Sequence, residues 1–385
     1  MSADFATSAD LTAQDAAHLR RALQLAELGL YTTDPNPRVG CVIADPGRVL
    51  GEGWHVRAGE PHAEVLALRA AGQRARGANV YVTLEPCSHT GRTPPCADAL
   101  IAAGVARVWC CTQDPNPKVA GSGIARLRAA GIEVSVGAFG REARALNPGF
   151  FSRFERHRPY IRLKMAMSLD ARTAPAAGGQ IWISGEASRA DVQTWRARSS
   201  AVLTGSGTVR CDDPKLNVRL SYGPWVRQPL RVVLDTQLSC RPDAQIFRDG
   251  GALTFAAVDA APPSRGDLKL ERVPRAPGGL DLDAVIARLA ALEMNEVLLE
   301  CGARLAGAFV ARGLVDELVL YVAPSLLGEN AAPLVHLGAG APPPSAAPVR
   351  TAVASAASVL SPNFEFSDVR RMGDDVRLVL TLRKH

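Results

Sequence analysis

The sequence predicts an α/β protein with two domains. Its 385 residues correspond to two or three typical domains of about 150 residues each, which excludes a single small module. Helix-like and strand-like segments alternate along most of the chain, a pattern typical of parallel strands with helices on the sheet faces. A charged string at 153–158 precedes Pro159 and a new strand, so we expect domains at 1–157 and 158–385.

The composition favours an ordinary globular protein. Hydrophobic residues make up 47%, charged residues 21% and aromatic residues 5%, a balance that excludes mainly disordered and collagen-like chains. No apolar run approaches the roughly 20 residues that span a bilayer. Residues 1–12 lack the basic start and apolar stretch of a signal peptide. We therefore expect a cytoplasmic protein with no membrane partner.

The net charge of +6 permits attraction to nucleic acid, membranes or phosphorylated metabolites without choosing among them. Single-stranded nucleic acid binds platforms of aromatic residues interleaved with charge, and the five Trp, five Tyr and ten Phe are thinly scattered. A phosphorylated small molecule is therefore favoured, with no nucleic-acid partner. The eight cysteines, in a chain without a secretion signal, predict free thiols or metal ligands.

The first half begins with an amphipathic helix over 15–30, where Leu19, Leu23, Ala26 and Leu30 recur at helical spacing. Alternating runs and turn residues predict the elements that follow. They are strands at 39–44 and 48–53 joined as a hairpin, a helix at 61–71, a strand at 79–84, a helix at 96–103, a strand at 107–112, a helix at 122–130 and a strand at 132–136.

The second half also mixes strands with helices. Its expected strands are 160–167, 201–204, 230–235, 252–258, 296–300 and 317–323. Its expected helices are 186–197, 283–292 and 305–312. The Pro-, Ala- and Gly-rich stretches 260–279 and 338–348 indicate loops rather than domain linkers, because strand-like sequence resumes after each.

A short repeat, Asp-Pro-Asn-Pro, is centred on Asn36 and again on Asn116. Two proline-locked turns account for it by backbone preference alone. The alternative places both loops at one rim of the sheet. There the two Asn amides would bind a ligand, with Arg38 or Lys118 supplying charge.

His62, Cys87 and Cys96 provide one imidazole and two thiolates, the number of ligands that leaves a fourth zinc position for water. Two thiolates neutralise Zn²⁺, so a bound water stays acidic enough to supply hydroxide near neutral pH. Glu64 stands at the first turn of the same expected helix as His62. A carboxylate beside the water is the general acid and base that a hydrolytic deaminase requires.

A structural zinc site in a non-catalytic protein is the alternative, and it would need a fourth ligand. His89, Cys110 and Cys111 are candidates for that ligand. The expected elements favour the catalytic interpretation, because two helices open at the metal and their amino-terminal charge lowers thiolate pKa values.

His-x-Glu followed by Pro-Cys and a second Cys resembles the zinc cytidine-deaminase superfamily. The usual Pro-Cys-x-x-Cys is absent, since eight residues separate Cys87 from Cys96. The longer sequence around these residues resembles the riboflavin-biosynthesis branch of that superfamily, the bifunctional pyrimidine deaminases and uracil reductases. The matching strings are TLEPCSH at 83–89, GRTPPC at 91–96, PRVG at 37–40 and GEPHAE at 59–64.

The resemblance implies a cytidine-deaminase-like α/β/α domain followed by a dihydrofolate-reductase-like α/β domain. It implies zinc on His62, Cys87 and Cys96, with Glu64 as the proton carrier. The deaminase would remove the 2-amino group of a diaminopyrimidinone that carries a phosphoribosylamino arm. The reductase would use NADPH to convert the ribosyl into a ribityl chain, and we expect a homo-oligomer.

The resemblance also assigns residues in the second half. NADPH contacts are expected at Ala166, Trp182, Thr208, Asp212 and Thr236, and along Gly302, Ala303, Arg304, Leu305, Ala306, Gly307 and Ala308. Substrate contacts are expected at Gln180, Arg196, Leu216, Arg219 and Glu300, with Asn36 in the first half. Guanidinium groups bind phosphate in bidentate fashion, which suits Arg196 and Arg219 to the substrate arm. Lys164 and Asp170 match the family as well, although a strand Lys and a turn Asp also have a structural interpretation.

From the residues alone, the second half offers a strand that meets a helix through Gly302, where exposed N–H groups can hold a phosphate. No Gly-x-Gly-x-x-Gly fingerprint is present, so tight glycine packing turns remain the alternative. The rival enzyme is a nucleic-acid base deaminase, which would have no nicotinamide site in residues 158–385.

Overall fold

The first half of the chain is built on a five-stranded sheet of order β2-β1-β3-β4-β5. The structure, a computed structural model, describes residues 11–89, 95–175, 182–219, 226–263, 266–337 and 364–383. The elements of this half are α1 (Ala13–Glu27), β1 (Gly40–Asp45), β2 (Arg48–Trp54), α2 (Ala63–Ala71), β3 (Asn79–Val82), α3 (Cys96–Ala103), β4 (Arg107–Cys110), α4 (Ser122–Ala129), β5 (Glu133–Val136), α5 (Gly140–Leu146) and α6 (Pro148–Glu155).

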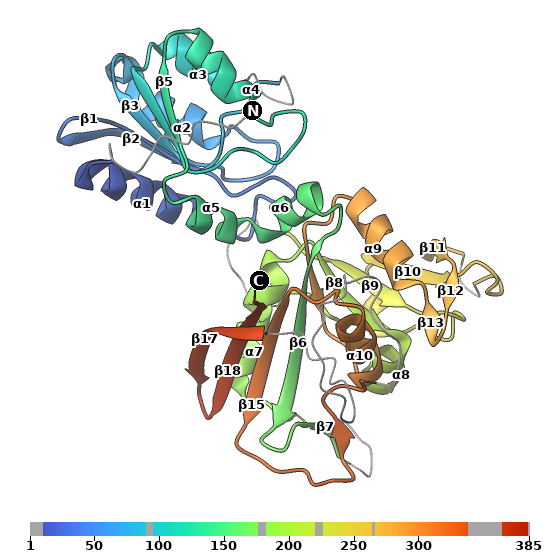
Figure 1. The fold of residues 1–385 in the computed structure, drawn as a ribbon. Helices are drawn as coiled ribbons and strands as arrows, with labels where there is room; N and C mark the ends of the chain where they lie inside the picture. The colour runs from blue at the N-terminus through green and yellow to red at the C-terminus, as the bar shows by residue number, and fades with distance from the viewer. Residues whose placement is uncertain are drawn as a thin grey trace, which may run out of the picture. The chain divides into compact units, whose positions relative to one another are not determined.

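Three layers result, with helices on both faces of the sheet (Figure 1). The predicted hairpin of β1 and β2 is confirmed, and β3, β4 and β5 run parallel as the alternation indicated. Residues of α1 and α5 pack with one face of the sheet. Residues of α2, α3, α4 and α6 pack with the other. The expected α/β/α arrangement is confirmed.

The first helix starts and ends earlier than the periodicity predicted. Thr12 caps it, because its hydroxyl accepts from the N–H of Asp15 and the Asp15 carboxylate accepts from the N–H of Thr12. The helix ends at Glu27, so Leu30 lies in the turn beyond it. Sequence analysis missed α5 and α6. The first buries only Ala143 and so shows no apolar stripe, and the second overlaps the charged string at 153–158.

The second half is built on a nine-stranded sheet of order β11-β10-β9-β8-β14-β6-β15-β18-β17. Its strands are β6 (Tyr160–Ser168), β7 (Arg172–Ala174), β8 (Ala201–Gly205), β9 (Leu230–Leu234), β10 (Ala252–Ala257), β11 (Lys269–Val273), β12 (Arg275–Ala276), β13 (Gly279–Leu280), β14 (Glu296–Leu299), β15 (Glu317–Ala323), β16 (Ala332–Pro333), β17 (Phe364–Met372) and β18 (Asp375–Leu382). Its helices are α7 (Glu186–Arg198), α8 (Ser206–Asp212), α9 (Leu282–Ala291) and α10 (Ala303–Ala311).

The central strands of this sheet, from β11 through β15, run parallel, and the hairpin of β17 and β18 adds an antiparallel edge. Residues of α9 and α10 pack on one face and residues of α7 and α8 on the other. All predicted strands and helices of this half are present, but α8, the terminal hairpin and five short strands, β7, β11, β12, β13 and β16, were not predicted. The expectation of a loop at 260–279 is wrong in part, because β11 and β12 lie within that stretch and β13 begins at its end. The hairpin lies on the sheet edge with exposed Phe366 and Val369, which obscures the inside-outside alternation of β17.

Contacts divide the described residues into two compact units between Arg158 and Pro159, with Val226 and Arg227 grouped with the first unit. No helix in the described part of the chain combines the length and hydropathy needed to cross a bilayer.

Glycines on β2 bring α2 unusually close to the sheet. A Cβ on Gly51 would overlap the carbonyl oxygen of Ala67, and a Cβ on Gly53 would overlap that of Ala63. Both atoms belong to backbone, so a side chain there would have to push the helix away. The glycines therefore fix the position of the first turn of α2, immediately after His62.

We expect Gly53→Ala to destabilise the protein by about 1 to 3 kcal/mol, because the added methyl group forces the α2 backbone off the sheet. The same displacement should weaken zinc retention. Urea unfolding and metal analysis of the purified variant measure both effects. Gly266→Ala is the control, since a Cβ at Gly266 meets no atom within 4 Å; equal stability of the two variants would contradict the role given to Gly53.

Candidate active sites

One rim of the first sheet collects the loops that sequence analysis singled out. β3 is antiparallel to β1 and parallel to β4. The start of β1 and the carboxyl ends of β3 and β4 therefore lie at the same end of the sheet. The N–H of Gly40 donates to Thr83 Oγ1 at 3.2 Å, and that of Glu85 donates to the carbonyl of Thr112 at 3.0 Å. The loops of the two Asp-Pro-Asn-Pro repeats therefore flank the end of β3, as the second interpretation of the repeat expected.

His62, Cys87 and Cys96 converge at this rim from three chain segments. His62 is the N-cap of α2, Cys87 lies beyond the end of β3, and Cys96 is the first residue of α3. His62 Nδ1 lies 3.6 Å from Cys87 Sγ and 3.3 Å from Cys96 Sγ. The backbone N–H of Cys96 donates to Cys87 Sγ at 3.4 Å, which shows α3 opening toward the thiolate.

The geometry of these three donors fits zinc. Zinc bonds of about 2.1 Å to nitrogen and about 2.3 Å to sulfur, at a tetrahedral angle, place the two atoms about 3.6 Å apart. The candidate ligand atoms all lie within 4.8 Å of one another. Among the described residues the cluster has these three members, and His89, Cys110 and Cys111 do not join it.

Glu64 lies in the first turn of α2 and is only 3% exposed. Its Oε2 has no hydrogen-bond partner among the described residues. Burial raises the pKa of Glu64 to about 7, against the lowering effect of a charged His62. A cation on the three donors would favour the carboxylate further. The group can therefore take up and release a proton near neutral pH.

His55 is a site residue that sequence analysis missed. It is buried, its ring meets that of His62 edge-on at 5.2 Å between centroids, and its Nε2 lies 3.1 Å from Asn36 Nδ2. Its Nδ1 lies 3.3 Å from the carbonyl of Pro61, so the neutral ring donates from Nδ1 and accepts from Asn36 at Nε2. Burial lowers the pKa of His55 to about 4. The available signal was a His directly after a strand that ends at the metal rim.

The basic side chains of the two repeats differ in their exposure to solvent. The guanidinium of Arg38 is buried and donates to the carbonyl of Leu146 at 2.6 Å, so the expectation that Arg38 offers charge to a ligand is wrong. Asn116 Oδ1 accepts from the N–H of Lys118 at 3.1 Å. Lys118 itself is exposed at the rim.

In the second unit, the predicted residues gather at the carboxyl edge of the parallel strands. β6, β14, β8 and β9 are neighbours and parallel. At this edge, Ala166 lies near the end of β6, Glu300 follows β14, Thr236 follows β9, and Thr208 and Asp212 lie on α8, which follows β8. Ligands of open parallel sheets bind at such an edge.

A buried charge cluster lies beside β14. Arg196 donates through Nε and Nη2 to the two oxygens of Glu300 at 2.6 and 2.9 Å, and through Nη1 to the carbonyl of Asn217 at 3.2 Å. The last pair of the β14–β6 register is Leu299 with Leu163, and Glu300 and Lys164 are the residues that follow these two. Burial opposes the charge of Glu300, but Arg196 and Lys164 outweigh it and keep the pKa of Glu300 below its ordinary value. Burial lowers the pKa of Lys164.

The segment from Gly302 to Ala308 is the first part of α10 and not a loop. Gly302 is the N-cap, and no side chain caps the helix. The N–H of Ala306 already donates to the carbonyl of Gly302 at 3.1 Å, so the N–H groups that lack a partner within the helix are those of Ala303, Arg304 and Leu305. Ala306 and Gly307 are buried, and a Cβ on Gly307 would overlap His336 backbone. A Cβ on Gly302 would lie 4.0 Å from Thr208 Oγ1, so α8 and α10 begin side by side.

The remaining predicted contacts lie in less regular surroundings. Trp182 is 69% exposed, and the Arg189 guanidinium lies 5.1 Å from its ring centroid. Leu216 is buried with φ of 51°, a strained backbone for a leucine of the kind that clusters at ligand sites. Arg219 is exposed, and its N–H donates to Gln193 Oε1 at 3.0 Å. Gln180 lies outside the described residues.

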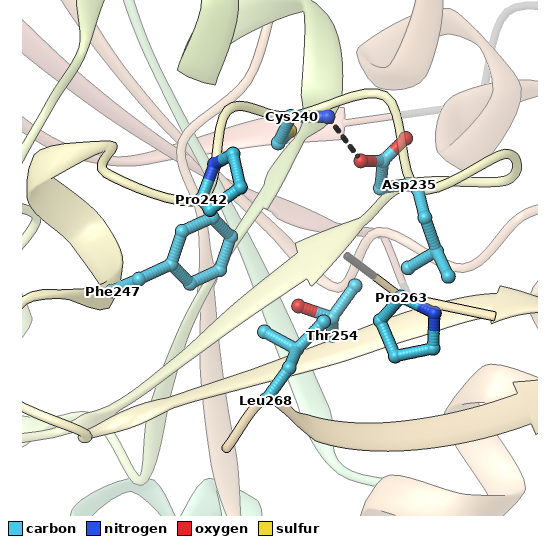
Figure 2. Close-up of a pocket in the computed structure, with 8 residues that line it drawn as sticks. Asp235, Cys240, Pro242, Phe247, Thr254, Pro263 and Leu268 are labelled. Atoms are coloured by element: carbon cyan, nitrogen blue, oxygen red, sulfur yellow. Dashed lines mark hydrogen bonds between the residues drawn. The ribbon is translucent and has the colours of Figure 1, made fainter. Parts of the chain in front are cut away.

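Figure 2 shows a mainly apolar pocket of the second unit, beside β9 and β10. It is lined by Asp235, Leu238, Cys240, Pro242, Phe247, Thr254, Pro263 and Leu268. The N–H of Cys240 donates to Asp235 Oδ2 at 2.7 Å. None of the predicted cofactor or substrate residues lines this pocket, although Asp235 directly precedes Thr236.

Comparison with known proteins matches the two halves separately. Residues 12–112 match the family model of the cytidine and deoxycytidylate deaminase zinc-binding region. Residues 159–376 match the model of the RibD C-terminal domain.

Full-length relatives agree with both matches. The riboflavin biosynthesis protein RibD of Escherichia coli strain K12 is 47% identical over 95% of this chain and 99% of its own. The solved structure of Acinetobacter baumannii RibD is similar with a TM-score of 0.85 and 41% identity, covering 96% of this chain and 99% of that one. A diaminohydroxyphosphoribosylaminopyrimidine deaminase/5-amino-6-(5-phosphoribosylamino)uracil reductase of Thermotoga maritima has a TM-score of 0.81 and 30% identity, over 96% and 99% of the two chains. The chain therefore belongs to the RibD family of riboflavin biosynthesis proteins, as a bifunctional enzyme with a zinc-dependent deaminase domain and an NADPH-dependent reductase domain.

Proposed function

We propose that residues 1–157 deaminate a diaminopyrimidinone carrying a phosphoribosylamino arm, and that residues 158–385 reduce its ribosyl chain. The two activities are those named for the Thermotoga maritima relative. The observation that carries the deaminase proposal is the convergence of His62, Cys87 and Cys96 beside a buried Glu64 with an unpartnered oxygen.

In the deaminase domain, His62, Cys87 and Cys96 would hold zinc, which when bound activates water toward an amidine-like ring carbon. Glu64 takes the proton of that water and delivers it to the leaving amine, so that the ring gains oxygen and ammonia departs. Asn36 contacts the substrate. Its Nδ2 is engaged by His55, which orients the amide and directs its Oδ1 as an acceptor.

In the reductase domain, residues at the carboxyl edge would hold NADPH, among them Ala166, Trp182, Thr208, Asp212 and Thr236. The free N–H groups at the start of α10 support a phosphate of the cofactor there. When bound, NADPH would supply hydride for reduction of the ribosyl chain, and the residues of this edge would contribute mainly orientation.

The substrate of the reductase would meet Gln180, Arg196, Leu216, Arg219 and Glu300. Because Glu300 occupies the fork of Arg196, we assign the phosphate chiefly to Arg219. Arg196 then holds the Glu300 carboxylate in place beside Lys164.

We further propose a cytoplasmic homo-oligomer that binds no nucleic acid. The exposed Phe366 and Val369 on the edge strand β17 support association between copies, because exposed apolar edge strands favour pairing. The scarcity of aromatic residues, 5% of the chain, supports the absence of a nucleic-acid partner.

Replacement of a proposed zinc ligand should empty the metal site. We expect Cys87→Ser and His62→Ala to lose most of their zinc, since two donors rarely retain the ion, whereas the wild type carries about one zinc per chain. Elemental analysis of purified protein measures the ratio. Cys110→Ser is the control, and loss of zinc in that variant would indicate a fourth, structural ligand.

Glu64→Gln should keep its zinc and lose ammonia release by about 10²-fold or more, because the amide cannot carry the proton. Ammonia assays with the diaminopyrimidinone substrate, together with zinc analysis, test this. NADPH oxidation on substrate that is already deaminated should be unchanged and serves as the internal control. Unchanged ammonia release would contradict the role of Glu64.

Arg219→Gln should raise KM of the reductase for its phosphorylated substrate by about 10- to 100-fold, because a charge-assisted hydrogen bond contributes about 1.5 to 3 kcal/mol. Steady-state NADPH oxidation measures KM and kcat. Arg248→Gln, another exposed arginine of the same unit, is the control. Equal KM values for the two variants would remove Arg219 from the site.

A further inference from the structure

Glu85 is a buried carboxylate to which the proposed mechanism gives no role. It follows β3, two residues before Cys87, and is 3% exposed. Its Oε1 accepts from the N–H groups of Gly123 and Ile124 at 2.9 and 3.2 Å. Its Oε2 accepts from those of Gly121 and Asp114 at 2.9 and 3.2 Å.

The four donors belong to one segment, residues 114–124, which includes the second Asp-Pro-Asn-Pro repeat and the start of α4. This segment lies against the strand end that carries Cys87. Ser122 Oγ is 2.6 Å from Ser88 Oγ, and a Cβ on Gly123 would overlap the carbonyl oxygen of Pro86. Nothing larger than glycine fits at 123. The segment is therefore held close to the strand end both by this packing and by the hydrogen bonds to Glu85.

The segment presents polar groups beside the metal cluster. Gly123 meets Pro86 and Ser122 meets Ser88, the two residues on either side of Cys87. Asp114 Oδ1 accepts from the N–H of Asn116 at 2.8 Å, so a shift of Asp114 would also move Asn116.

Only an ionised carboxylate satisfies all four donors. Each oxygen has two acceptor positions, and the four N–H groups use them in pairs. A glutamine of the same shape would turn its NH₂ group toward two of the N–H groups and leave them unpaired. Unpaired buried donors are costly, so the segment would move away from the strand end.

We propose that Glu85 is a positioning residue of the deaminase, whose carboxylate holds residues 114–124 as one wall of the substrate site. The inference rests on the proposed function, since that wall matters only if the substrate binds at the metal rim. Glu85 itself touches neither the metal nor the substrate and acts through the backbone of the segment.

The test is Glu85→Gln in the full-length zinc-loaded protein, assayed for ammonia release with the diaminopyrimidinone substrate. We expect KM to rise by about tenfold or more, with kcat per bound zinc within about threefold of wild type. NADPH oxidation on deaminated substrate should not change. An unchanged KM combined with a lower melting temperature would show a merely structural role and overturn the proposal.

Tyr81→Phe is the matched control on the same strand. It removes the hydrogen bond from Tyr81 to Asp15 Oδ1, 2.6 Å long, without touching residues 114–124. It should lower stability and leave the deaminase KM at the wild-type value. A rise in KM equal to that of Glu85→Gln would mean that any weakening of β3 has this effect, and would contradict the specific role of Glu85.

Amide hydrogen exchange on the wild type tests the proposal even if Glu85→Gln does not fold. The N–H groups of Gly121, Gly123 and Ile124 should exchange slowly without substrate, because the carboxylate holds them. Exchange as fast as that of an exposed loop would refute the clamp. If the wild type releases no ammonia from this substrate, or if Glu64→Gln stays active, the proposed function fails and not the clamp.

Discussion

The metal cluster depends on one packing constraint, the close approach of α2 to β2. His62 lies at the start of that helix, and its imidazole must come within 3.6 Å of thiols that are 25 and 34 residues away in sequence. The approach is possible because Gly51 and Gly53 present no side chain to the helix backbone. Alanines at 63 and 67 keep the helix side of the contact equally small. The position of His62 therefore depends on two glycines that belong to neither the candidate metal donors nor the proton carrier.

The candidate sites of the two units lie at corresponding places in their folds. In each, parallel strands end at one edge, and helices begin there with unsatisfied N–H groups. In the first unit these helix starts carry His62 and Cys96, which we propose as donors to a metal. The second leaves the start of α10 without a side-chain cap, which suits an anionic cofactor. One architecture thus supports a hydrolytic and a redox site, and the side chains at the edge decide which.

Sequence alone predicted the fold class and the hairpin, and it singled out the three side chains that converge as candidate metal donors and the buried Glu64, because each leaves a local pattern of spacing or alternation. It did not predict α5, α6 or α8, because α5 and α8 each bury a single residue and α6 overlaps the charged string that indicated the domain boundary. It missed His55, whose role appears only when the rim brings it against His62 and Asn36. It also could not foresee that Arg38 is buried against Leu146 or that Glu300 occupies the fork of Arg196. Such pairings form between segments far apart in the chain, and local sequence patterns do not indicate them.

Three buried glutamates show how surroundings decide what a carboxylate does. Glu85 accepts from four backbone N–H groups, so both of its oxygens are engaged by the backbone of one segment. Glu300 is neutralised by the fork of Arg196, with Lys164 nearby, so its charge is retained but balanced. Glu64 alone keeps an oxygen without a partner in the part of the chain that the structure describes. Because no hydrogen bond compensates the desolvation of that oxygen, burial raises the pKa of Glu64 to about 7. The number of donors that each carboxylate receives thus separates the clamp proposed for Glu85, the paired charge of Glu300 and the proton carrier proposed for Glu64.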